Sequence, residues 1–194
     1  MSPLRRHPAG AEIPITVGLI VALAVQNAVP PFATDMYSPA FPQVARDLAT
    51  SPTAVGLTLT AFFVGMGLGQ VVGGAVSDQR GRRRPLIVGG VVCSLGAVVC
   101  ALAPSIAVLM IGRFMQGMGG GVAAVVGRAV VVDVARGDRL AQIMSILMAV
   151  GGLAPMIAPV AGGAVLSVAS WRAVFWCLGA FGLLMTVMAA VFVP

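Results

Sequence analysis

Six apolar runs, each about 20 residues long or longer, constrain the fold of this sequence more than any other feature. A helix needs about 20 mostly apolar residues to cross the hydrocarbon core of a bilayer. Each run therefore predicts a membrane-spanning helix, and the predicted fold class is an all-α integral membrane bundle. The predicted spans are residues 13–34, 54–76, 85–103, 106–125, 140–166 and 171–193.

The composition excludes several other classes of protein. Hydrophobic residues make up 59% of the chain and charged residues only 9%, against about 25% charged residues in an ordinary soluble domain. The three cysteines form no C-x-x-C pair, and the single histidine, His7, lies near the N-terminus. We therefore expect no metal site and no disulfide framework. Because no nucleophile and base are paired, we also expect no enzyme activity and no cofactor.

All twelve cations are arginines, and their positions predict the orientation of the spans. If the chain crosses the bilayer at every span, one side receives eight arginines and the other receives Arg46 and Arg172. Connections rich in arginine stay in the cytoplasm. We therefore predict a cytoplasmic tail over residues 1–12 and a six-helix bundle over 13–194 in the plasma (inner) membrane. The net charge of +6 then reflects membrane topology, and no nucleic-acid partner is expected.

A short internal sequence similarity indicates a repeat. The sequence Gly-Gly-Ala-Val closes the second span at residues 73–76 and the fifth span at residues 162–165, and Arg82 and Arg172 follow at similar distances. Spans one to three and four to six are therefore predicted to be copies in opposite membrane orientation, an inverted 3+3 repeat typical of secondary transporters. Coincidence is the alternative, because glycine, alanine and valine dominate the composition.

The connection after the second span combines a carboxylate, a turn glycine and a cluster of arginines. Gly74 is expected to let a neighbouring helix approach closely, and Gly81 suits a backbone position with positive φ. Asp78 is a candidate partner for an arginine or a helix N-terminus. The alternative is that these arginines, Arg82 and Arg83 among them, only set the topology and that Asp78 is simply solvated.

Arg113 is the second notable residue, because a charge inside a membrane span is costly and normally faces a cavity or a carboxylate. Asp35 is the only acidic residue along the first span. Since the first span ends and the fourth begins on the same side, the two residues lie at comparable depth. We predict that they pair in one state and separate in another. The alternatives are an Arg113 that snorkels to the interface and an Asp35 that caps its helix in water.

These segments resemble the major facilitator superfamily. The loop resembles the signature G-x-x-x-D-[RK]-x-G-[RK]-[RK], except that Gln79 stands where a cation is usual. Residues 109–117 resemble the L-x-x-x-R-x-x-Q-G pattern of proton-coupled members. Residues 155–163 resemble the antiporter signature G-P-x-x-G-G, with Ala158 in place of the first glycine, although a simple packing face is an equal alternative. Residues 33–42 resemble the drug:proton antiporter branch and, within it, the Bcr/CflA-type multidrug exporters.

The resemblance implies the N-terminal half of a twelve-helix transporter, with the second six-helix half absent and the substrate path between the halves. It implies proton-driven export of small amphipathic drugs or metabolites by alternating access, with the proton gradient as the energy source. A metabolite importer, or an inactive half that needs a partner half, remains the alternative. The implied roles are proton coupling by Asp35 and Arg113; substrate contacts by Asn27, Phe32, Tyr37 and Gln116; a gating loop of Gly74, Asp78, Gly81, Arg82 and Arg83; and a fifth-span motif of Pro155, Pro159, Gly162 and Gly163.

Overall fold

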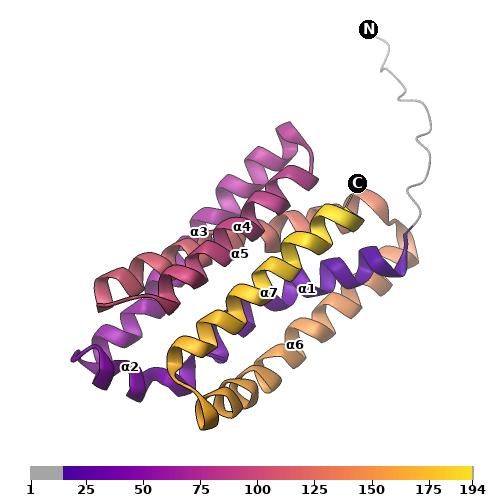
Figure 1. The fold of residues 1–194 in the computed structure, drawn as a ribbon. Coiled ribbons are helices and arrows are strands. Elements are labelled where there is room, and N and C mark those ends of the chain that lie inside the picture. Colours follow the sequence, from indigo (N-terminus) through magenta and orange to yellow (C-terminus); the bar gives the residue numbers. More distant parts are fainter. Residues whose placement is uncertain (1–14, 194) are drawn as a thin grey trace, which may run out of the picture.

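Helices make up nearly all of the chain in the computed structural model, which describes residues 15–193 (Figure 1). Six of the helices are long and apolar enough to cross a membrane, and no strand occurs in the described range. The tail predicted over residues 1–12 lies outside it. In chain order the elements are α1 (Val17–Asp35), η1 (Ser38–Ala40), α2 (Phe41–Asp47), α3 (Pro52–Arg80), α4 (Arg83–Ala101), α5 (Ile106–Val134), α6 (Gly137–Val168) and α7 (Trp171–Phe192).

Local sequence signals set the ends of the helices. The side chains of Thr16, Ser51 and Ser105 each accept a hydrogen bond from a backbone N–H in the first turn of the helix that follows, as N-cap residues do. Gly81 ends α3 with a φ of 80°, which confirms the positive φ expected from the sequence. Helices α3 and α5 run further than predicted, to Arg80 and Val134, because an α-helix continues beyond the apolar part of a span.

Helix α5 lies at the centre of the packing. Helices α3 and α4 both pack along α5, α4 also packs on α7, and α1 contacts α5, α6 and α7. The apolar side chains that point outward are large, for example Val71, Leu95 and Val160. In a bilayer these side chains face lipid, because apolar surface there needs no cover from protein. The bundle therefore exposes large apolar residues to lipid, while small residues lie where two helix backbones approach closely.

The inverted repeat is visible in how the helices pack. If α1, α3 and α4 are exchanged with α5, α6 and α7, the contact of α3 with α5 becomes the contact of α6 with α1, and the contact of α4 with α5 becomes that of α7 with α1. In the first repeat Gly65, Gly69 and Gly73 lie against the α5 backbone at Phe114, Met118 and Val122. In the second repeat the buried residues at the same spacing are Ala154, Ala158 and Gly162.

The glycine pairs at residues 73–74 and 162–163 have similar surroundings. Gly73 packs on α5, and Gly162 packs on the backbone of Met36 at the end of α1. The second glycine of each pair, Gly74 or Gly163, has open space where its side chain would be. The expectation that Gly74 permits close approach of a helix is therefore wrong, because the helix surface turns this position away from α5. The close approach occurs one residue earlier, at Gly73.

Candidate functional site

Arg113 is completely buried in the centre of the bundle. Its Nη1 atom donates hydrogen bonds to the backbone carbonyl of Ala33 on α1 (2.8 Å) and to Oε1 of Gln116 (2.6 Å). Gln116 lies one turn further along α5 and is also buried, so the L-x-x-x-R-x-x-Q-G spacing brings the two side chains together. Arg113 does not snorkel to the interface, since none of its surface is exposed.

Three aromatic rings, from α3, from α7 and from the turn that follows α1, surround the Arg113 guanidinium. Its central carbon lies 4.5 Å from the ring centroid of Phe62 on α3, 4.9 Å from that of Tyr37 and 5.8 Å from that of Phe175 on α7. The Tyr37 hydroxyl is 3.2 Å from Oγ1 of Thr58, which itself donates to a backbone carbonyl. The cation is thus held by ring faces, which attract a desolvated guanidinium. We call Tyr37, Phe62 and Phe175 the aromatic cage.

One edge of the Arg113 guanidinium remains free. Within the described residues, Nε and Nη2 are buried and have no hydrogen-bond partner. Asp35 lies two residues after Ala33 in the sequence. Its side chain is partly buried and accepts a hydrogen bond from the Thr34 hydroxyl (3.3 Å). No ion pair joins Asp35 to Arg113 in this conformation. The predicted similarity in depth is confirmed, because Arg113 bonds to the same turn of α1 that carries Asp35.

The four predicted substrate contacts fall into two groups. Tyr37 and Gln116 belong to the surroundings of Arg113 and are fully buried. Asn27 instead donates from Nδ2 to the Leu147 carbonyl (2.7 Å) and so links α1 to α6, and the Phe32 ring lies 5.4 Å from that of Phe181 on α7. The neighbouring Gln26, which no sequence motif singles out, is buried with no partner for its carboxamide among the described residues.

The loop predicted to act in gating is held together by Arg82. Its Nη1 atom donates to Oδ1 of Asp78 (2.6 Å) and to the Ser77 hydroxyl (2.7 Å), and its Nε donates to Oδ2 of Asp133 on α5 (2.7 Å). The Asp133 carboxylate, followed by that of Asp78, raises the pKa of Arg82 above its usual value. Arg83 donates to the carbonyl of Ala190 near the end of α7 (2.5 Å). We call this end of the bundle the arginine end.

The sequence predicts that Asp133, which lies beyond the apolar run of residues 106–125, belongs to a hydrated turn between the fourth and fifth spans, and this prediction is wrong. The turn begins only after Val134, so Asp133 stays on α5 and faces Arg82. The interpretation failed because the apolar run stops at residue 125 although the helix does not. A carboxylate eight residues beyond that run gives no sequence signal of its partner, which is 51 residues away.

The fifth-span motif meets the end of α1. Helix α6 continues through Pro155 and Pro159 without interruption. Gly162 has the backbone of Met36 where its side chain would be, and Met36 lies between Asp35 and Tyr37. Gly163 faces away. The motif therefore contacts the segment of α1 that carries the candidate proton site, through one of its two glycines.

The described residues contain no group of three His, Cys, Asp or Glu side chains that could hold a metal ion. Most of their ionic side chains lie at or near the ends of the helices, Arg128 lies further inside α5 but is exposed, and Arg113 is fully buried. Six apolar helices in an inverted repeat, with one buried cation, define a membrane bundle of the secondary-transporter type.

Comparison with known proteins identifies the family. A family model described as Major Facilitator Superfamily matches residues 23–194, and the chain belongs to that superfamily. It is 39% identical over 186 residues to the uncharacterized MFS-type transporter YdgK of Bacillus subtilis, covering 95% of this chain and 46% of that protein. It is 35% identical over 175 residues to a bicyclomycin resistance protein homolog of Haemophilus influenzae, covering 90% of this chain and 44% of that protein.

The multidrug resistance protein MdtL of Escherichia coli is a third relative, 30% identical over 159 residues, covering 82% of this chain and 41% of MdtL. The chain thus spans about half the length of the curated relatives it matches. Among solved structures, the proton:xylose symporter XylE bound to 6-bromo-6-deoxy-D-glucose has a TM-score of 0.80 at 14% identity, covering 89% of this chain and 44% of that one. The structure of a D-xylose-proton symporter has a TM-score of 0.80 at 15% identity, covering 91% of this chain and 48% of that one. These two structures bear on the fold alone, which is confirmed as half of a major facilitator bundle.

Proposed function

We propose that this chain is the N-terminal half of a proton-coupled exporter of small amphipathic drugs or metabolites, driven by the proton gradient without a cofactor. The observation that carries the proposal is the free edge of the buried Arg113 guanidinium, next to the turn of α1 that holds Asp35. A buried cation without a carboxylate is costly, so this edge is the natural receptor for a carboxylate that approaches and leaves during transport.

The coupling step follows from the charges. Ionised Asp35 is attracted to Nε and Nη2 of Arg113, and this pairing draws the end of α1 toward α5. A proton taken up by Asp35 neutralises the carboxylate and releases it, because a neutral carboxyl group gains much less from the guanidinium than an anion does. Arg113 then keeps only the hydrogen bonds from Nη1 to the Ala33 carbonyl and Gln116, and Nε and Nη2 are free again. The proton and the helix movement are thereby linked.

The direction of transport is inferred from the contact between α6 and α1. Gly162 lets the backbone of Met36 lie directly on α6, next to Asp35, so that a movement of α6 displaces the proton site. This arrangement suits an exchanger, in which the proton site and the substrate path open alternately. The relatives named for multidrug and bicyclomycin resistance support an amphipathic drug as the class of substrate.

The proposal also includes placement. Arg80, Arg82, Arg83 and Arg84 at the arginine end favour a cytoplasmic position for that end, in the inner membrane. The substrate path then lies between this bundle and a second six-helix half, since secondary transporters bind substrate at the interface between their repeats. Asn27 and Phe32 on α1 are the proposed substrate contacts of this half.

Asp35→Asn tests the proposal in the full-length transporter. Asparagine keeps the shape of the side chain but cannot ionise, so drug efflux driven by an imposed pH gradient in inverted vesicles should fall at least tenfold. Drug binding in the absence of a gradient should remain. Asp138→Asn at the start of α6 is the matched control, because Asp138 is exposed and distant from Arg113. Efflux at the normal rate in Asp35→Asn would sink the proposal.

A second measurement addresses the inactive-half alternative. The purified 194-residue chain in liposomes, tested alone, should give no drug-dependent proton flux, because it supplies only one wall of the path. Flux should appear when a complementary second half is present. Substrate-linked flux from the chain alone would show that a half-sized unit is sufficient.

A further inference from the structure

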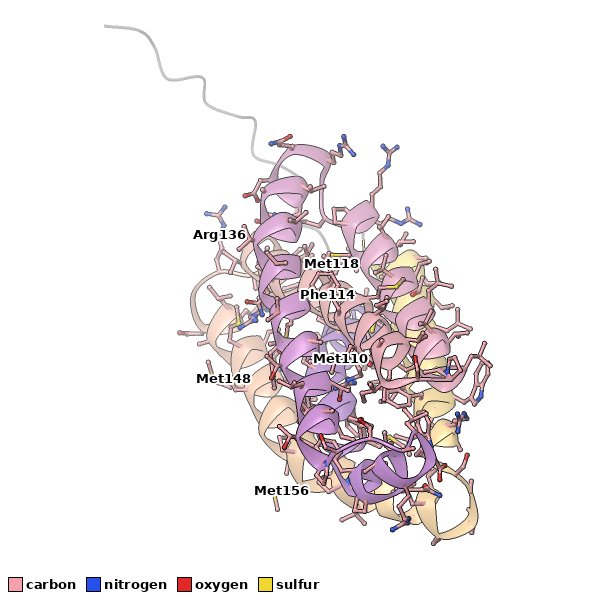
Figure 2. The ribbon with its side chains drawn as sticks, turned by 90° about the vertical axis from the view of Figure 1, so that its left-hand side faces the viewer. Met110, Phe114, Met118, Arg136, Met148 and Met156 are labelled. Carbon is pink, nitrogen blue, oxygen red and sulfur yellow. The ribbon has the colours of Figure 1, made fainter. Side chains whose placement is uncertain are left out.

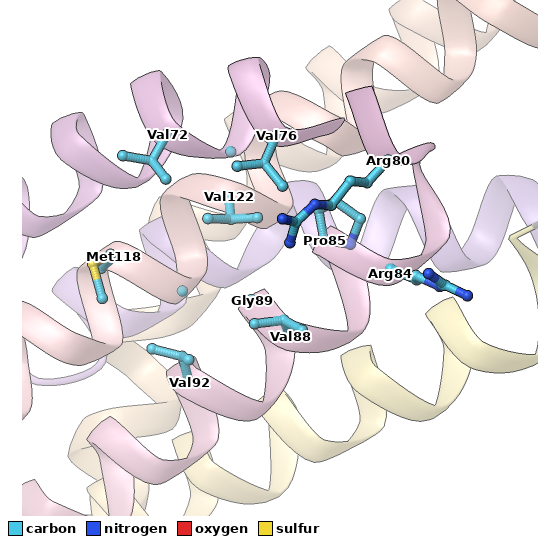
Figure 3. Close-up of a pocket in the computed structure, with 12 residues that line it drawn as sticks. Val72, Val76, Arg80, Arg84, Pro85, Val88, Gly89, Val92, Met118 and Val122 are labelled. Carbon is cyan, nitrogen blue, oxygen red and sulfur yellow. The ribbon is translucent and has the colours of Figure 1, made fainter. Parts of the chain in front are cut away.

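An apolar groove separates α3 from α4 on the outer surface of the bundle (Figure 3). Its volume is about 460 Å³, within the range of about 300–1,000 Å³ that is usual for ligand sites. Valines from α3 and α4 form its walls, and α5 forms its floor. The residues that line it are Val72, Gly73, Val76, Arg80, Arg84, Pro85, Val88, Gly89, Val92, Met118, Gly119 and Val122.

The groove exists because α3 and α4 pack on the same helix but only slightly on each other. Gly73 on α3 and Gly89 on α4 both approach Val122 of α5, and Gly119 approaches α4. Three glycines at the floor bring the backbones together and leave no side chain to fill the space above. The valines on either side, exposed by 55% at Val72 and 61% at Val88, then border an open channel.

Two arginines stand at one end of this channel. Arg80 is the last residue of α3 and Arg84 lies in the first turn of α4, and both are exposed. Figure 3 shows Arg80 extending from α3 toward Pro85. Within the described part of the chain, the side chains of Arg80 and Arg84 form no hydrogen bond and no ion pair. By contrast, Arg82 and Arg83, which lie between them in the sequence, each donate a side-chain hydrogen bond. The mouth of the groove therefore carries two uncompensated positive charges.

The length of the groove matches one leaflet of a bilayer. From Arg80 to Val72 the channel follows eight residues of α3, which is about 12 Å at 1.5 Å per residue, close to half of the roughly 30 Å hydrocarbon core. Met118 is the last α5 residue of the lining at the end away from the arginines, and Phe114 and Met110 follow it along α5 at intervals of about one turn (Figure 2). An elongated apolar channel that starts at two cations suits a ligand with an anionic head and a hydrocarbon chain.

The second repeat lacks this combination. Arg80 lies seven residues after Gly73. The residue seven positions after Gly162 is Ala169, just beyond the end of α6, so no arginine occupies the equivalent position. The arginines at the mouth are thus specific to the groove between α3 and α4 and are not imposed by the fold that both repeats share.

We propose that this groove binds an anionic phospholipid, with the phosphate between Arg80 and Arg84 and one acyl chain along the valine walls. The two free cations favour an anionic headgroup over a zwitterionic one. The apolar lining favours a lipid over a water-soluble phosphate, because a soluble anion gains nothing from the valines. The site is separate from Arg113 and does not depend on the proposed transport function.

Native mass spectrometry of the purified chain with added lipid tests the headgroup. Phosphatidylglycerol should bind in preference to phosphatidylcholine with the same acyl chains. Each arginine near an anionic lipid surface contributes about a fivefold gain in affinity, so R80Q/R84Q should bind phosphatidylglycerol about 25-fold more weakly. R136Q/R139Q is the matched control, because it removes the same charge from exposed residues outside the groove. An equal loss in both double variants would overturn the proposal, as would displacement of the lipid by inorganic phosphate at similar concentration.

Two further variants test the acyl chain. Val88→Trp fills the groove and should lower lipid binding at least fivefold, whereas Val91→Trp, on the same helix but outside the lining, should leave it unchanged. A photo-crosslinking amino acid at position 88, irradiated in cell membranes, should yield a phospholipid adduct. A protein adduct in its place would show that another polypeptide covers the groove and would refute the proposal, as would normal lipid binding by Val88→Trp.

Discussion

At the scale of single residues, Arg113 shows how a membrane bundle holds a charge without a carboxylate. An arginine inside a membrane span costs up to about 2.5–3.5 kcal/mol on insertion scales, the value at the centre of the span. A desolvated guanidinium over a ring face gains up to about 2 kcal/mol, and the aromatic cage supplies three such faces. Two hydrogen bonds from Nη1 add to this. These contacts offset the cost of burial and still leave one edge of the guanidinium free.

The cage leads to a prediction for Arg113→Lys. Lysine keeps the charge, but its compact ammonium group lacks the planar fork that stacks on rings and offers a second edge. We expect drug efflux to fall at least tenfold while the variant still inserts and folds, with a loss of only a few degrees in melting temperature. Efflux assays and fluorescence-detected gel filtration measure the two effects. Arg136→Lys, at an exposed position, is the control, and normal efflux in Arg113→Lys would contradict the role given to the free edge.

At the scale of elements, glycine determines which helices touch. Gly65, Gly69 and Gly73 of α3 face α5, while Gly117 and Gly121 of α5 face the α3 backbone at Phe62 and Met66. Each helix thus offers small residues to the other, and the two backbones come together over about three turns of α3. Lipid supplies no hydrophobic force between helices, so such close packing is the main source of association.

Gly69→Val should therefore destabilise the bundle. The new side chain would meet the carbonyl of Met118, and overpacking typically costs about 1–3 kcal/mol. For a domain of this size we expect the melting temperature to fall by roughly 2–12 °C. Gly67→Val is the matched control, because nothing lies within 4 Å of that position. Equal melting temperatures for the two variants would contradict the packing argument.

The second repeat gives an independent pair of variants. Gly162→Val places its side chain against the backbone of Met36, whereas Gly163→Val points into open space. We expect the first to lose stability and the second to remain close to the parent chain, as measured by thermal unfolding in detergent. A larger loss in Gly163→Val would mean that the two repeats do not use their glycine pairs in the same way.

The same elements show what the sequence predicts and what it does not. All six spans are predicted correctly, because the thickness of the bilayer sets the length of each apolar run. The positive φ of Gly81 follows from local backbone chemistry. The side chains of Arg113 and Gln116 form a hydrogen bond because the two residues lie one turn apart on α5. The rings of Phe62 and Phe175 could not be predicted as the cage, since they come from α3 and α7 and phenylalanine also faces lipid. The pairing of Asp133 with Arg82 was not predicted, because α5 continues beyond the end of its apolar run.

At the scale of the whole molecule, the arginine end ties the helices together. Arg82 joins the end of α3 to α5 through Asp133, and Arg83 reaches α7 at Ala190. Arginine is charged at every physiological pH. The raised pKa of Arg82 means that its favourable contribution is fully present at those pH values and is lost as pH rises through the raised pKa. Exposed ion pairs of this kind contribute at most about 1 kcal/mol each.

A double-mutant cycle of Arg82→Gln and Asp133→Asn should therefore give a small coupling. We expect it to stay below about 1 kcal/mol in unfolding free energy and to decrease at high salt, because the pair is partly exposed. Asp138→Asn should show no coupling to Arg82→Gln. Efflux should be more sensitive than stability, since the loop is proposed to act in gating. Strictly additive effects on both stability and efflux would refute a role for the pair.

The aromatic cage also has a consequence for biosynthesis. Arg113 leaves the ribosome about 60 residues before Phe175, which at about 5–20 residues per second is roughly 3–12 s. During that interval the charge in the fourth span has Ala33, Tyr37 and Phe62 from earlier helices, but the ring from α7 is still missing. Insertion of the fourth span then depends on helices already delivered to the membrane, and the charge is fully enclosed only when the last helix arrives.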